Sequence, residues 1–183
     1  MAETEIRAYA TSKSFHPQTV ERWLSWDAAD RDALEQLALA LKLSENHLRD
    51  LMDWLEEIAL RERVPVHSIL ASKTIADIET DPRLGRADRL KRIKEQIRRL
   101  RFPRLAGTED KIRAKIQGLK LHPDIRLTVS PGLEGGCLQV DLAAASHDDI
   151  KRLANKLREA TENKLMADIF DLLAGKLPNQ ARS

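Results

Sequence analysis

The residue types that most often carry out chemistry are scattered through this sequence. No two of its five histidines lie four residues apart, the spacing that a helical metal site needs. The one cysteine, Cys137, excludes an internal disulfide and a cysteine-based zinc cluster. Adjacent acids such as Glu56-Glu57 fit a solvated helix face better than a catalytic pair. We therefore expect a protein that is not an enzyme and that holds no metal and no cofactor.

A glycine-rich segment at 131–136 is the second place where chemistry could lie. A phosphate site would need a helix to begin directly after these glycines. The residues that follow instead alternate between apolar and polar, which predicts a strand. We interpret the segment as the turn of a hairpin.

Positive charge is concentrated in the middle of the chain. Residues 81–120 contain 14 basic and 5 acidic residues, whereas residues 1–80 contain 9 and 15, and the whole chain has a net charge of +2. Within the basic block, 86–101 predicts a helix with one apolar stripe. Its candidate phosphate-binding residues are Arg89, Lys91, Arg92, Lys94, Arg98 and Arg99. The alternative is an exposed helix whose charges pair with one another four residues apart.

A helix-turn-helix pattern runs from Glu35 to Leu55. Ala38 is small enough for a close helix crossing, and Ser44 is a good N-cap for the second helix. The exposed start of that helix offers three candidate base contacts, Asn46, His47 and Arg49. Five carboxylates on the same helix would oppose DNA phosphates. An αα-hairpin that reads no bases therefore remains the alternative.

Between 125 and 142 the apolar period changes to two, which predicts two strands joined by the glycine-rich turn. Helical patterns flank them, so 108–174 reads as an αββα unit. A two-stranded sheet is marginal alone, and pairing of two copies would cover its edges. The expected dimer residues are Ile125, Leu127, Val129, Leu138, Val140, Leu142, Leu153 and Leu157. The alternative is a sheet that is covered within one chain.

These elements predict an α+β fold that is mostly α. The expected organisation is a loose arm, a helical helix-turn-helix-like domain, a basic connecting helix, an αββα dimerisation-like domain and a tail, at 1–15, 16–80, 81–107, 108–174 and 175–183.

Two stretches resemble ParB-type chromosome partitioning proteins. The run EQLALALKLSENHLRDLMDWL is similar to the helix-turn-helix of that family, and 108–174 is similar to its C-terminal dimerisation domain. The CTP-binding domain of the family, with its GERR-type motif, has no counterpart here. The resemblance covers less than half of the chain and implies a dimeric, DNA-associated relative without CTP-gated sliding.

The expected function is association with duplex DNA as a homodimer, mainly through phosphate contacts of the basic helix. The alternative is an adaptor whose basic helix docks on an acidic protein partner, including the acidic N-terminal domain of another copy. With no apolar run of about 20 residues and no visible secretory signal, we expect a bacterial cytoplasmic protein without a membrane partner.

Overall fold

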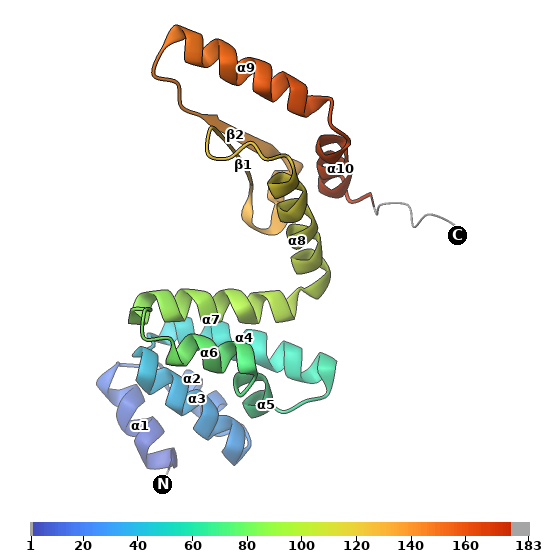
Figure 1. Cartoon of the computed structure of the whole chain (residues 1–183). Coiled ribbons are helices and arrows are strands. Elements are labelled where there is room, and N and C mark those ends of the chain that lie inside the picture. Colours follow the sequence, from blue (N-terminus) through green and yellow to red (C-terminus); the bar gives the residue numbers. More distant parts are fainter. Residues whose placement is uncertain (1, 177–183) are drawn as a thin grey trace. The chain divides into compact units, whose positions relative to one another are not determined.

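The computed structural model describes residues 2–176 and divides the chain into two compact units. The first unit extends to Phe102, and the second begins at Pro103. Helices dominate both units, and the second also contains a two-stranded antiparallel sheet (Figure 1). This confirms the predicted α+β, mostly α fold class.

Seven helices form the described part of the first unit. They are α1 Ala2–Ser12, α2 Pro17–Leu24, α3 Ala28–Leu41, α4 Glu45–Glu62, α5 Val66–Leu70, α6 Lys73–Thr80 and α7 Arg86–Arg101. Pro17 begins α2 where a missing N–H costs nothing, and Pro65 follows the end of α4 because it cannot continue a helix. The core of the unit is built around Trp23, Leu34, Leu48 and Leu55, all fully buried.

The predicted loose arm at 1–15 is wrong, because these residues contain α1. Ile6 and Ala10 on α1 and Phe15 after it are buried in the core of the unit. The Tyr9 hydroxyl also lies 3.0 Å from the carbonyl oxygen of Ala38 and 2.8 Å from that of Leu43. The apolar stripe of α1 is short, and the helix is held by packing against α2 and α3.

The predicted connector at 81–107 is also wrong, because α7 belongs to the first unit. It packs across α4 and α6 (Figure 1) and buries Ile93 and Ile97 completely in the same core as Trp23. Full burial of two isoleucines is worth about 3 to 6 kcal/mol, so this helix is structural as well as basic.

The second unit contains α8 Pro103–Gly118, β1 Ile125–Val129, β2 Leu138–Leu142, α9 His147–Thr161 and α10 Lys164–Leu173. The strands pair with Ile125 opposite Leu142 and Leu127 opposite Val140, so their apolar residues share one face. A 3-10 turn, η1 Pro131–Gly136, joins them. Left-handed backbone at Gly132 and Gly135, with φ of 72° and 78°, explains the glycines there.

Two boundaries of the αββα unit differ from the sequence prediction. Helix α8 begins at Pro103 rather than at 108, since Thr108 lies inside the helix and donates to the Arg104 carbonyl. The last helix is divided in two where the Asn163 side chain caps α10 by accepting from the Leu165 N–H. Of the predicted tail, only Gly175 and Lys176 lie within the described residues.

Ion pairs between elements hold the second unit together. Lys115 of α8 lies 2.6 Å from Asp168 of α10 and lowers the pKa of that carboxyl. Lys156 of α9 lies 2.8 Å from Asp124, just before β1, and together with Arg152 lowers the pKa of Asp124. These contacts tie α10 to α8, and α9 to the residue that precedes β1.

Candidate nucleic-acid interface

A short turn fixes the start of α4, the helix that carries the candidate base contacts. Lys42 takes the left-handed conformation that ends α3, with φ of 51°, and Leu43 is fully buried. The Ser44 side chain then accepts a hydrogen bond from the His47 N–H, as predicted. Asn46 and Arg49 are exposed on this first turn and a half, whereas His47 is half-buried.

Five carboxylates of α4 are engaged by neighbouring helices, and three of them face α2. The Thr19 hydroxyl and the His16 N–H donate to Glu45 at 2.6 and 3.0 Å and hold the pKa of that carboxyl below its usual range. Arg22 binds Asp53 at 2.7 Å and Glu56 at 2.6 Å. The indole N–H of Trp26 also donates to Glu56, at 2.7 Å.

The other two of these five carboxylates face α7. Lys94 lies 2.7 Å from Asp50, and Arg101 lies 2.6 Å from Glu57. The Lys94 ammonium also lies 5.0 Å from the centre of the Trp54 ring and 3.4 Å from His47 Nδ1. The acidic row that opposed DNA binding in the sequence analysis therefore joins three helices, and each of its charges has a donor.

The six candidate phosphate-binding residues of α7 fall into two groups. Lys91 and Arg92 are exposed. The other four are half-buried: Lys94 pairs with Asp50, Arg98 pairs with Glu95 at 2.8 Å, Arg89 donates to the Asp81 carbonyl at 3.0 Å, and Arg99 also has a partner. The fold thus turns most of the positive charge of α7 toward its own chain.

This pairing balances the charge of the first unit. Residues 1–102 contain 18 basic and 18 acidic residues, although α7 alone contains eight basic and two acidic ones. The uneven distribution seen along the sequence is therefore largely compensated within one folded unit. Any attraction to phosphates must come from the local placement of exposed cations.

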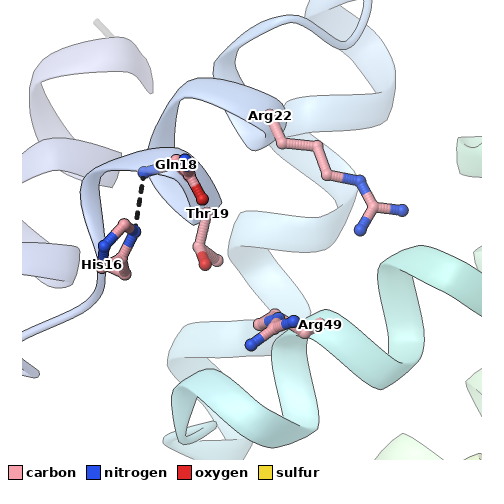
Figure 2. Close-up of a pocket in the computed structure, with 5 residues that line it drawn as sticks. All are labelled: His16, Gln18, Thr19, Arg22 and Arg49. Carbon is pink, nitrogen blue, oxygen red and sulfur yellow. Dashed lines mark hydrogen bonds between the residues drawn. The ribbon is translucent and has the colours of Figure 1, made fainter.

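A polar hollow of about 390 Å³ lies between α2 and α4. Figure 2 shows its lining: His16, Gln18, Thr19 and Arg22 from α2 and its start, with Arg49 from α4. Glu45, Asp53 and Glu56 hold its walls together, so three carboxylates stand against two arginines. This balance does not favour an anion, and the N-terminus of α2 already binds the Glu45 carboxylate.

The eight predicted dimer residues are not equally available on the second unit. Ile125, Leu127 and Leu153 are buried in its own core, and Val129, Leu138 and Leu157 are half-buried. Val140 and Leu142 on β2 remain 39% and 37% exposed. Ile150 on α9, which sequence reasoning missed, is 38% exposed. The sheet is therefore covered from within along β1 and open along β2.

Two further features are absent from residues 2–176. No helix in that range is long and apolar enough to cross a membrane. No group of three or more histidine, cysteine, aspartate or glutamate side chains there could hold a metal ion. The chain matches no protein-family model, no curated protein and no solved structure.

Proposed function

We propose that this chain associates with duplex DNA as a dimer, mainly through phosphate contacts and with little sequence preference. One observation carries the proposal: every carboxylate that opposed DNA along α4 has a partner on α2 or α7, while Arg49 and Lys91 stay exposed. Asn46 adds an exposed amide at the start of α4. The resemblance to the ParB-type helix-turn-helix supports the same role for α4.

The charge balance limits the strength of this association. Each phosphate contact displaces counterions and adds affinity that falls steeply with salt. The first unit is neutral overall, and its exposed cations on α4 and α7 number only a few. We therefore expect weak binding, in the range of about 10⁻⁴ to 10⁻⁶ M that is typical of non-specific complexes at physiological salt. Pairing of two copies would double the number of contacts.

The second unit supplies the pairing in this proposal. Val140 and Leu142 lie on the same face of β2, and their exposure leaves an apolar strip with Ile150 nearby in the sequence. A second β2 strand beside the first would satisfy the backbone groups of this edge and cover the strip. The interface we propose is thus narrower than the eight residues predicted from the sequence.

The test of DNA association compares two doubly substituted full-length chains. Fluorescence anisotropy of a labelled random duplex at low salt should show binding by the natural chain. Arg49→Glu with Lys91→Glu should weaken duplex binding at least tenfold, because each change replaces a proposed phosphate contact by a charge that repels phosphate. Lys13→Glu with Lys111→Glu makes the same change in net charge at exposed positions of α8 and the loop after α1. If both variants lose affinity equally, the interface is not on α4 and α7.

The test of pairing is the sedimentation of full-length chains. Val140→Lys should convert the dimer to a monomer, since a charge on the proposed interface would be buried without a partner. Gln139→Lys places the same charge on the opposite face of β2 and should leave the dimer intact. A natural chain that sediments as a monomer at about 50 μM would refute the dimer.

The alternative function, an adaptor whose basic helix docks on an acidic protein, now favours a different partner. Docking of α7 on the acidic N-terminal helices of another copy has little support, because Asp50 and Glu57 already pair with Lys94 and Arg101 of the same chain. An acidic partner of another kind is favoured by a separate feature of α4 and α7, a groove between them.

A further inference from the structure

A groove of about 630 Å³ lies between α4 and α7 in the first unit. Its floor is apolar and comes from Trp54 on α4 and from Ala87 and Leu90 on α7. Its rim carries His47, Lys91, Lys94, Glu95 and Arg98. Neither DNA association nor dimerisation, as proposed above, uses the apolar floor of this groove.

The floor is suited to apolar side chains rather than to phosphates. The ammonium group beside the floor already has partners, since Lys94 binds Asp50 at 2.7 Å and covers one face of Trp54. A phosphate placed there would lose water without gaining a free donor from the floor. That face of the indole is also closed to a stacked nucleic-acid base. A volume of this size holds several aliphatic side chains.

The rim favours a ligand with negative charge. Of its three cations, Lys94 pairs with Asp50 and Arg98 pairs with Glu95, so Lys91 is the one that can attract a carboxylate of a ligand. Lys91 is the most exposed of the three and sits one turn after Ala87 on the same helix. An apolar side chain on the floor would therefore bring a neighbouring carboxylate of its own chain close to Lys91.

We propose that this groove docks a short helical segment of a partner protein that presents leucines flanked by acidic residues. The arrangement matches the general mode in which an amphipathic helix lays its apolar face into a groove. Apolar contact supplies the affinity, and the cationic rim selects acidic over basic segments. The floor of the groove carries the inference, and only Lys91 on its rim is shared with the proposed DNA contacts.

The experiment uses the full chain and three labelled helical peptides of 16 residues, built from alanine and glutamate. The first has leucines four residues apart, the second replaces those leucines by alanine, and the third replaces the glutamates by lysine. Anisotropy should show binding of the first peptide at tens of micromolar. The other two should bind at least tenfold more weakly.

Two protein variants locate the site. Ala87→Trp fills the groove from an exposed position and should abolish binding of the first peptide, while its circular dichroism stays that of the natural chain. Ala8→Trp, an equal change at an exposed position on α1, should leave binding unchanged. Lys91→Glu should weaken the acidic peptide and Lys13→Glu should not.

Three results would overturn the proposal. One is equal binding of the leucine and alanine peptides, which would mean that the floor is unused. Another is loss of binding in Ala8→Trp as well as in Ala87→Trp. The third is absence of peptide binding together with loss of duplex binding in Ala87→Trp, which would assign the groove to nucleic acid. Failure of duplex binding alone leaves the peptide result standing.

Discussion

Replacing Lys94 by methionine isolates the charge that ties α7 to α4. Methionine keeps most of the apolar stem, so the change removes the ion pair with Asp50 at 2.7 Å and the contact over Trp54 at 5.0 Å. Lys94 is only 20% exposed, so its hydrogen-bonded pair is worth about 1 kcal/mol or slightly more. The cation–π contact adds about 0.5 to 1 kcal/mol. We expect a loss of about 1.5 to 2 kcal/mol.

The assay is urea unfolding followed by tryptophan fluorescence. All three tryptophans, Trp23, Trp26 and Trp54, lie in the first unit, so this signal reports that unit alone. With a slope of about 1.5 kcal/mol per M, the midpoint should fall by about 1 M. Lys91→Met, at an exposed position of the same helix, should shift the midpoint by less than about 0.3 M. Equal midpoints for the two variants would refute the role of Lys94 in holding α7 on α4.

Three further predictions concern burial and pH. Ile97→Ala should destabilise the first unit by about 2 to 4 kcal/mol in the same assay, because the side chain is fully buried; a negligible loss would restore α7 as a connector. Burial, with Glu5 and Asp32 nearby, raises the pKa of Glu35, which is 6% exposed. Its ionised form is therefore disfavoured in the fold, so Glu35→Gln should raise the urea midpoint at pH 7 and lose this advantage below about pH 4. Hydrogen bonding to Lys156 lowers the pKa of Asp124, so that pair should stabilise the second unit above about pH 4 and fail as the pH falls further. Hydrogen exchange of α9 amides would measure this loss of stability. An Asp124→Asn variant whose exchange depends on pH as strongly as that of the natural chain would contradict the prediction.

Local signals in the sequence were sufficient for the hairpin and for the turn before α4. Alternation of apolar residues predicted both strands and their shared apolar face, because the period of two in a strand is a property of the backbone. The Ser44 cap and the burial of Ala38 followed from the same kind of local pattern. These features depend on residues that are close together in the chain.

The role of α7 could not be predicted in this way, because it depends on partners about 44 residues away. A run of basic residues looks like a free positive surface until Asp50 and Glu57 are known to face it. One signal was present: the acidic excess of 1–80 and the basic excess of 81–120 are opposite in sign. Ion pairs between these two segments of one chain are the simplest way to neutralise both excesses.

The exposure of the predicted dimer residues could not be predicted for a similar reason. Period two identified six apolar strand residues but could not say which of them the chain covers by itself. Leu153 of α9 packs with Ile125 and Leu127, and this leaves β2 as the open strand. The exposure of Ile150 depends on the orientation of α9, which sequence periodicity does not fix.

The salt dependence of duplex binding tests the central proposal most directly. If two copies each neutralise two to three phosphates, a plot of log association constant against log salt should have a slope of roughly −3.5 to −5.5. The natural chain should show this slope with random and with genomic duplexes alike, measured by anisotropy from 20 to about 150 mM salt. Absence of binding at the lowest salt, or a slope near zero, would contradict the account.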